Sequence, residues 1–284
     1  MQTLTVIGPG RLGSTLARLA RQSGEFEVVD VMARRVEPLR LACDFIGAGR
    51  PVSEMRQLAP VDLYLLAVPD AAVAFCARAL AAAGVVPAGS VVFHASGVGE
   101  ASLLQPLAER GAHVASLHPA FSFADPARAV AGFAGTLCAL EGDEAACLRL
   151  EPFVLALGGR PFRLAAGGKA AYHAALSVAS NYLVALTAMA QGLTRQAGVP
   201  AELAAPLLGG LMRQTLDNAL ELGPRAALTG PILRGDVGTV ERHLSVLADV
   251  ELASAYRALG RQTVALAGER LPDEARRQLM ALLY

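Results

Sequence analysis

Short apolar runs alternate with segments of helical period from the N-terminus of this chain to about residue 164. Apolar runs of a few residues are typical of strands buried in a parallel sheet, whereas apolar spacing of three and four predicts helices. The predicted strands are residues 3–8, 25–33, 61–69, 89–96, 112–118, 135–141 and 160–164, with a short one near Val52. The predicted helices are residues 11–24, 36–46, 71–84, 101–111 and 144–158. This alternation predicts a mostly parallel, doubly wound sheet that helices cover on both faces.

The pattern changes in the second half, because residues 168–284 show helical periods alone. Segments that contain glycine or proline divide this half into about four to six predicted helices. They are Gly198-Val199-Pro200, Gly223-Pro224, Gly230-Pro231 and Leu271-Pro272. We therefore predict an α/β domain over residues 1–165 and a smaller all-α domain over residues 166–284.

The first predicted strand ends in a glycine loop, VIGPGRLG, with glycines in the order G-x-G-x-x-G. One copy of this motif is weak evidence, but this one follows a strand, opens a helix and begins a βαβ unit. Gly8 permits the tight turn, Gly10 leaves room for a pyrophosphate, and Gly13 lets the helix pack closely on the strand. The free N–H groups of the helix N-terminus suit an anion. The loop predicts a dinucleotide site with the candidate contacts Gly8, Pro9, Gly10, Arg11, Leu12 and Gly13.

The end of the second strand indicates which dinucleotide to expect. NAD enzymes hold the ribose 2′-hydroxyl there with an acidic side chain. Here the strand runs into Arg34 and Arg35, whereas Asp30 lies three residues before the strand's end, too early for this contact. A guanidinium suits a 2′-phosphate, to which it donates two parallel hydrogen bonds, so we predict NADP as the cofactor. A solvated pair of arginines on a loop is the alternative interpretation.

Ligands of such sheets bind beyond the carboxyl ends of the strands, and three predicted strands end in polar or turn-forming residues. Val68, Pro69 and Ser96 are candidate cofactor contacts, and His94 and His118 are candidate substrate contacts. The sequence around Ser96 lacks the first glycine of the G-x-S-x-G elbow, so we reject a hydrolase. Either histidine alone is equally typical of a protein core, whereas two at adjacent strand ends favour a polar pocket.

The segment KAAYHAALSVASNYL, residues 169–183, predicts an apolar helix with five polar side chains on one side. On a helical wheel these side chains fall within an arc of roughly 120°. A solvated face would carry more charges, and compact hydrogen-bonding groups with one cation suit a narrow, partly dry cleft. A polar network inside a helix–helix interface is the alternative. The five residues are Lys169, His173, Ser177, Ser180 and Asn181.

Three of these side chains are candidate catalytic residues: Lys169, His173 and Asn181. Hydride transfer between a nicotinamide and C=O or C=N needs a proton donor for the heteroatom, and either Lys169 or His173 can supply it. Partial burial would lower the pKa of Lys169 towards neutral, and Asn181 can orient a polar substrate without titrating. Ser177 and Arg234 are further candidate substrate contacts, although Arg234 can instead pair with the aspartate two residues after it.

Composition and charge exclude several other classes of protein. The 25 basic and 25 acidic residues give a net charge of zero, which argues against nucleic acid as a partner. No apolar run reaches the ~18 unbroken residues of a membrane span, and the first residues show neither a basic segment nor a small-residue cleavage site, so we expect no signal peptide. The four cysteines lack the spacing of a metal site, so we expect reduced thiols, no metal and a cytoplasmic protein.

Six motifs together resemble those of a bacterial family with a Rossmann-like N-terminal domain and a C-terminal helical domain of unassigned function. They are GPGRLG, AVPD, HASG, HPAFSF, KAAYHAALSVASN and TGPILRGD, and the resemblance covers nearly the whole chain. That family is similar to pyrroline-5-carboxylate reductase, ketopantoate reductase, deazaflavin-dependent NADP reductases and the β-hydroxyacid dehydrogenases. The resemblance implies a Rossmann-type NADP-binding domain and a homodimer formed through the helical domain, for which the apolar second half also argues.

The candidate catalytic helix departs from one of these relatives. The β-hydroxyacid dehydrogenases carry a lysine, with an asparagine one turn later, on their first interdomain helix; Lys169 matches the lysine, but His173 replaces the asparagine. We therefore predict an NADP-dependent oxidoreductase acting on a small carbonyl or imine compound, in our interpretation a carboxylate. A non-catalytic NADP-binding sensor or assembly protein and a deazaflavin-dependent NADP reductase stay open as alternatives.

Overall fold

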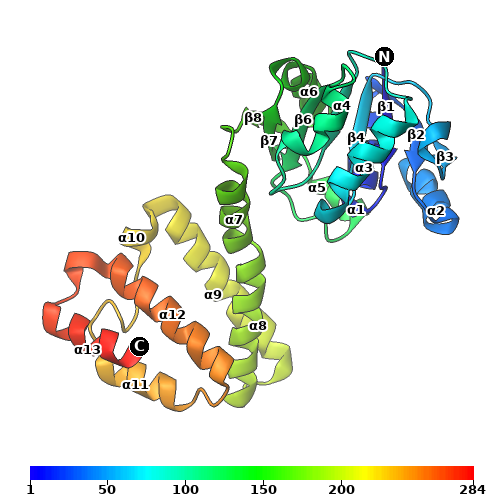
Figure 1. The fold of residues 1–284 in the computed structure, drawn as a ribbon. Helices are drawn as coiled ribbons and strands as arrows, with labels where there is room; N and C mark the ends of the chain where they lie inside the picture. Colours follow the sequence, from blue (N-terminus) through cyan, green and yellow to red (C-terminus); the bar gives the residue numbers. More distant parts are fainter. The chain divides into compact units, whose positions relative to one another are not determined.

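The structure is a computed structural model that describes residues 1–284, the side chain of Val36 excepted. By its contacts the chain forms two compact units, Met1–Asn181 and Tyr182–Tyr284, and each is described by itself (Figure 1). The first unit includes helix α7 (Lys169–Ala179). The predicted domain boundary at residues 165 and 166 stays a prediction.

An eight-stranded sheet forms the centre of the first unit, with the strand order β3-β2-β1-β4-β5-β6-β7-β8. Its strands are β1 (Gln2–Ile7), β2 (Phe26–Met32), β3 (Arg50–Val52), β4 (Leu63–Leu66), β5 (Val91–His94), β6 (His113–Pro119), β7 (Leu137–Gly142) and β8 (Arg160–Arg163). All neighbouring pairs are parallel except β6 and β7, which are antiparallel. The first six strands have the order of a doubly wound dinucleotide-binding sheet, with the switch point between β1 and β4, so the predicted fold class is confirmed.

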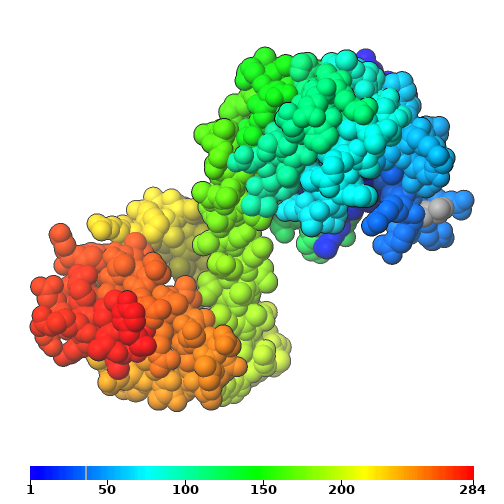
Figure 2. Space-filling model, in the orientation of Figure 1, coloured from blue at the N-terminus to red at the C-terminus, as the bar shows by residue number. Residues whose placement is uncertain are grey.

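Helices cover both faces of this sheet (Figure 1). They are α1 (Arg11–Ser23), α2 (Val36–Ile46), α3 (Asp70–Ala83), α4 (Gln105–Ala108), α5 (Pro126–Gly132) and α6 (Glu144–Ala156), with 3₁₀ turns η1 (Met55–Gln57) and η2 (Ala101–Leu104). Leu4 and Val6 pack in one buried cluster with residues of α1, α2 and α6, whereas Ile7 packs in a second with residues of α3 and α4. Figure 2 shows only small parts of the dark-blue N-terminal segment, because later segments cover most of it.

In the first unit, one predicted helix needs correction and one observed helix was not predicted. The predicted helix 101–111 is a 3₁₀ turn followed by the four-residue α4, with a proline in the first turn of α4. The sequence analysis also missed α5, although Asp125-Pro126 is a helix start signal. The Asp125 side chain accepts a hydrogen bond from the Arg128 N–H at 2.8 Å, which caps this helix.

The second half of the chain contains α8 (Asn181–Gln196), α9 (Ala201–Leu222), α10 (Pro224–Ala227), α11 (Val237–Ser245), α12 (Val250–Ala267), η3 (Gly268–Arg270) and α13 (Asp273–Leu283). With α7 this makes seven α-helices, one more than the range predicted. The buried apolar cluster of this unit includes Val240 of α11, Val264 of α12 and Leu279 of α13. In α8 and α9, by contrast, Ala204 is the one buried residue among those that the structure describes.

The segment predicted as one helix over residues 169–183 is divided at Ser180 between α7 and α8. The Ser180 hydroxyl donates to the Leu176 carbonyl at 2.7 Å, a bond back by four residues that often bends helices. Taken together, Lys169–Gln196 is long and apolar enough to cross a membrane by length and composition, with a mean hydropathy of 1.2. One such segment is weak evidence for a span, and the absence of a membrane partner stays a prediction.

Candidate functional site

The glycine loop between β1 and α1 has a different steric requirement at each glycine. Gly8 has φ +89°, and a Cβ there would lie 2.7 Å from the Ala67 carbonyl oxygen. A Cβ on Gly13 would lie 2.6 Å from the Gly8 carbonyl oxygen, so both positions need glycine for the loop to pack. A Cβ on Gly10, in contrast, would meet nothing within 4 Å. The space beside Gly10, at the N-terminus of α1, is therefore open to an anion such as a pyrophosphate.

A cavity of about 530 Å³ adjoins this loop at the carboxyl ends of β1, β2 and β4. Its lining combines the loop, the end of β2 and the turn after β4. The lining residues are Gly8, Pro9, Gly10, Ala33, Arg34, Arg35, Pro38, Ala67, Val68 and Pro69. The structure thus brings the two predicted arginines and the predicted Val68-Pro69 turn to one cavity with the glycine loop.

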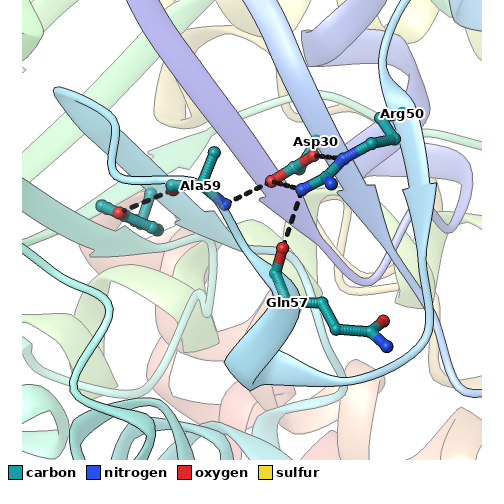
Figure 3. A network of polar contacts seen from close by, with 5 residues as sticks. Asp30, Arg50, Gln57 and Ala59 are labelled. Carbon is teal, nitrogen blue, oxygen red and sulfur yellow. Dashed lines mark hydrogen bonds and ion pairs between the residues drawn. The ribbon is translucent and has the colours of Figure 1, made fainter.

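Asp30, the acidic residue nearest this cavity in β2, is bonded elsewhere (Figure 3). Its fully buried carboxylate accepts hydrogen bonds from Arg50 at 2.8 and 3.2 Å and from the Ala59 N–H at 2.7 Å. Arg50 also donates to the Gln57 carbonyl at 2.7 Å. Asp30 therefore holds β3 and η1 to the sheet, which leaves Arg34 and Arg35 as the charged side chains lining the cavity.

Three other predicted cofactor contacts have structural partners of their own. The Arg11 guanidinium donates to the Ala124 carbonyl at 3.2 Å, and Leu12 packs against the core. Ser96 is buried, and its hydroxyl accepts a hydrogen bond from the Gly99 N–H at 2.8 Å. Ser96 therefore shapes the turn after β5, and a direct contact with a cofactor stays a prediction.

Lys169 does not face an open cleft, in contrast to the sequence prediction. Its side chain is 1% exposed, and its Nζ donates to the Ser96 carbonyl at 2.6 Å and to the Ser116 hydroxyl. Burial lowers the pKa of Lys169 to about 8, against the opposing effect of Glu141 and other carboxylates. The helical wheel placed Lys169 on the same side of the helix as His173, but the turn after β5 and strand β6 cover that side at the first turn of α7. Lys169 thus fastens α7 to the sheet.

The later turns of α7 line a separate cavity of about 380 Å³ with the segment that follows β6. Four predicted site residues meet there: His118, His173, Ser177 and Asn181. The other lining residues are Ala120, Phe121, Ser122, Leu176, Ala179 and Ser180. We call this cavity the histidine pocket.

The imidazoles of His118 and His173 meet edge to face in this pocket, with ring centroids 5.9 Å apart and planes at 82°. A Cβ on Gly97 would lie 2.8 Å from Nε2 of His173 and 2.9 Å from Nε2 of His118, so both nitrogens approach Gly97. Burial, with the charges of Lys169 and His173, lowers the pKa of His118 to about 4. Nδ1 of His118 lies 3.2 Å from the hydroxyl of Tyr172, a residue that the sequence analysis did not single out.

His94 has the role of a core histidine, so its prediction as a substrate contact needs correction. The side chain is fully buried; Nε2 donates to the Glu100 carbonyl at 3.0 Å, and Nδ1 accepts from the Ser96 N–H at 3.2 Å. Burial lowers the pKa of His94 to about 4. With both ring nitrogens bonded, His94 supports the turn after β5 and has no free nitrogen for a ligand.

Arg234 belongs to the second unit and is exposed. The aspartate two residues on, Asp236, accepts hydrogen bonds from the backbone and hydroxyl of Thr239 at 3.0 and 2.6 Å and so caps α11. Asp236 therefore has a structural partner of its own, and a substrate contact for Arg234 stays a prediction.

Two family models match the chain. Residues 2–119 match the Rossmann-like domain, and residues 136–263 match a domain of unknown function, DUF2520. The chain thus joins a Rossmann-like domain to a DUF2520 domain. Strands β1 to β6 and the glycine loop lie within the Rossmann-like match, whereas β7, β8 and α7, which carries His173, lie within the DUF2520 match.

Several solved structures share this fold. A candidate NADP oxidoreductase from Bacteroides fragilis is 22% identical with a TM-score of 0.78, covering 93% of this chain and 98% of its own. A pyrroline-5-carboxylate reductase from Coxiella burnetii is 18% identical with a TM-score of 0.61, covering 95% and 99%. A pyrroline carboxylate reductase from Plasmodium falciparum, with NADP bound, is 11% identical with a TM-score of 0.61, covering 100% and 98%. At such identities the likeness shows the fold alone, and the comparison with curated proteins gave no match.

Proposed function

We propose that this Rossmann-like and DUF2520 chain is an NADP-dependent oxidoreductase that transfers a hydride to or from a small carbonyl or imine compound. One observation carries the proposal: the cavity of the glycine loop and the histidine pocket lie on the same carboxyl edge of one sheet. In the strand order β5 lies between them, and a Cβ on Gly97, in the turn after β5, would clash with the rings of both pocket histidines. An extended dinucleotide seated on the loop spans such an edge across the switch point. The similar protein described as an NADP oxidoreductase and the similar pyrroline carboxylate reductase with NADP bound support the same choice.

The residues of the cavity beside the glycine loop fit the two anionic parts of NADP. Gly10 leaves the space for the pyrophosphate, and the N-terminus of α1 offers N–H groups to it. Arg34 and Arg35 suit the 2′-phosphate, because a guanidinium forms paired hydrogen bonds with phosphate oxygens. When bound, the nicotinamide would supply or accept the hydride.

Of the two candidate proton donors, Lys169 and His173, we prefer His173. Lys169 is sealed against the sheet and its Nζ already has two acceptors, whereas His173 lines the histidine pocket. Histidine side chains exchange protons near neutral pH and are the commonest general acids and bases of enzymes. The residues that line this pocket include neither lysine nor arginine, so the donors that the pocket offers to a substrate carboxylate are the histidines and neutral groups such as Ser177 and Asn181.

The proposal is tested by NADPH binding and NADPH oxidation with a panel of small carbonyl and imine compounds. His173→Ala should leave the NADPH affinity unchanged and reduce turnover by about 10²- to 10⁴-fold, the usual contribution of a general acid. His243→Ala, in the second unit, is the matched control and should leave both unchanged. NADPH binding without turnover of any compound would favour the sensor, and NADP reduction by a reduced deazaflavin would favour the third alternative.

We also propose that the protein is a cytoplasmic homodimer held together through α8 and α9. These helices leave large apolar side chains exposed, including Val184 at 71%, Leu211 at 61% and Leu220 at 76%. Large exposed apolar side chains in such number are typical of a subunit interface. Light scattering should give the dimer mass for the native chain and for Leu148→Glu on α6, and the monomer mass for Leu211→Glu combined with Leu220→Glu.

A further inference from the structure

Lys169 is the only lysine of the chain, because every other basic side chain apart from the histidines is an arginine. It is also a cation that the proposed proton transfer does not use, since its side chain is 1% exposed. Its Nζ donates to two neutral oxygens, the Ser96 carbonyl at 2.6 Å and the Ser116 hydroxyl. Among the residues that the structure describes, no carboxylate forms an ion pair with it. Lys169 is thus a buried charge whose bonding partners are neutral.

A buried ammonium group is an unfavourable way to attach a helix, because the ion loses its water of hydration. Burial lowers the pKa of Lys169 to about 8, against the opposing effect of the carboxylates of Glu141, Asp70 and Glu100, so the group stays mainly protonated at neutral pH. An apolar side chain would pack the same helix without this desolvation, whereas directed hydrogen bonds define the register of a contact. The lysine therefore suits a place where the register of α7 matters.

The turn after β5 contacts two successive turns of α7. The Ser96 carbonyl accepts the hydrogen bond from Lys169, and the next residue, Gly97, borders the ring of His173. A Cβ on Gly97 would lie 2.2 Å from Cδ2 of His173, so the ring occupies the space that a side chain at this position would need. Two adjacent residues of the turn therefore hold Lys169 and His173, which are one helical turn apart.

Strand β6 contacts the same two turns of α7 with residues that are two apart. The Ser116 hydroxyl accepts from Lys169, and the rings of His118 and His173 meet with centroids 5.9 Å apart. Residues i and i+2 of a strand share a face and lie about 6.6 Å apart, and residues i and i+4 of a helix are separated by a rise of about 6 Å. The spacing of the two contacts on β6 thus matches the spacing of Lys169 and His173 on α7.

We propose that Lys169 is a positioning residue, whose ammonium group fixes α7 in the register that keeps His173 at the histidine pocket. The inference rests on the proposed function, in which His173 is the proton donor, and adds a residue that acts through it. Without the two bonds of Lys169, α7 can slide or turn on β6, and a shift of one residue turns His173 by about 100°. A general acid must lie within hydrogen-bond reach of its substrate, so such a shift abolishes the proton transfer although the imidazole is still present.

The position of His173 can be measured by NMR without any turnover. In the full chain with labelled histidine, nuclear Overhauser contacts should connect the rings of His118 and His173, with His173→Gln identifying the signals. These contacts should be lost or strongly weakened in Lys169→Met, which keeps an unbranched side chain but removes all three N–H donors. Contacts of equal strength in the native protein and in a folded Lys169→Met would overturn the inference.

Ser116→Ala is a milder variant that tests the same bond from the side of β6. It removes one of the two acceptors of Lys169 and retains the lysine and the Ser96 carbonyl. The Overhauser contacts between the two rings should weaken in part, and kcat should fall about three- to tenfold, the value of one hydrogen bond. Where Lys169→Met does not fold, unchanged contacts and unchanged kcat in Ser116→Ala overturn the inference.

A matched control lies at the amino ends of the strands in the same sheet. The Asp62 carboxylate accepts two hydrogen bonds from Thr3, from the backbone N–H at 2.9 Å and from the hydroxyl at 2.7 Å. Asp62→Ala therefore also removes two hydrogen bonds that join segments distant in the chain. It should lower Tm and leave the contacts of His118 with His173, the NADPH affinity and kcat unchanged. If Asp62→Ala weakened these contacts as much as Lys169→Met, loss of stability alone would explain both results and the positioning role would be overturned.

Kinetics distinguish action through His173 from an independent role. Lys169→Met should lower kcat about ten- to a hundredfold with little change in KM or NADPH affinity, because the cavity beside the glycine loop does not include the contacts of Lys169. In the His173→Ala background, Lys169→Met should cause no further loss. A further loss of the same size would show that Lys169 acts independently of His173, which overturns the inference. If the Overhauser result holds but the native protein turns over no compound, the proposed function fails while the positioning role stands.

Discussion

The glycine loop and helix α7 both carry residues of the candidate site, but the two segments contribute to it in different ways. In the loop, the absence of side chains is what matters. A Cβ at Gly8 or Gly13 would clash with neighbouring atoms, whereas a Cβ at Gly10 would meet only open space. In α7, polar side chains on one arc of the helix have separate roles. Lys169 is sealed against β5 and β6, whereas His173 lines a pocket one turn later. Motif spacing therefore determines the loop, but helical phase alone does not determine what covers each turn.

The largest effect is expected from filling the space beside Gly10. Gly10→Val places a side chain where a Cβ meets nothing, so the fold and Tm should be nearly unchanged, while NADPH affinity should fall by at least about a thousandfold, or ~4 kcal/mol. Gly13→Val should lose affinity and stability together, because its Cβ would overlap the Gly8 carbonyl. Calorimetric titration and thermal unfolding of both variants test this. Tight NADPH binding by Gly10→Val would contradict our placement of the pyrophosphate.

The burial of Lys169 predicts a specific dependence of stability on pH. Its pKa of about 8 in the folded chain is below the ordinary value of 10.5, so the unfolded chain binds more protons between these values. The free energy of unfolding should therefore rise as the pH increases from about 8 to 10.5, by up to about 3 kcal/mol. Lys169→Met should lack this rise in denaturant titrations across that window. Parallel curves for the native and variant proteins would place Lys169 in solvent instead.

The burial of His94 predicts a second dependence of stability on pH, in the acid range. Its pKa of about 4 in the folded chain is below the ordinary 6.5, so acid favours the unfolded state between these values. Stability should be fully present above pH 6.5 and should fall by roughly 3 kcal/mol as the pH decreases to 4. His94→Gln should weaken this dependence in the same denaturant titrations. An equal loss in both proteins would mean that other groups cause the acid unfolding.

The smallest of these effects concerns the choice between NADP and NAD. Arg34→Ala combined with Arg35→Ala should weaken NADPH binding about ten- to a hundredfold and leave NADH binding unchanged, because only NADPH carries the 2′-phosphate. Arg40→Ala, on α2 but outside the lining of the cavity, is the control. Equal losses for NADPH and NADH would show that the two arginines act on a part common to both cofactors.

Most of the fold and the cavity beside the glycine loop could be predicted from the sequence, because the residues that indicate them are close together in the chain. Strand and helix periods, the glycine spacing and Arg34-Arg35 all depend on residues that are close together in the chain. The histidine pocket was predicted in part: His118 and His173 meet, but His94 is bonded inside the core. Tyr172 was missed because its partner is 54 residues away, and its position next to His173 carried no separate signal. Which polar groups are covered depends on tertiary packing, which a helical wheel does not contain.

The central claim is that a dinucleotide on the glycine loop extends its reactive end to the histidine pocket. A crystal structure of the full chain with NADPH tests it most directly. We expect the 2′-phosphate on Arg34 or Arg35 and the nicotinamide carbon C4 facing His118 and His173 across a space for one small molecule, roughly 3–3.5 Å from its carbonyl carbon. A nicotinamide directed away from both histidines, or a ribose without contact to either arginine, would contradict the account.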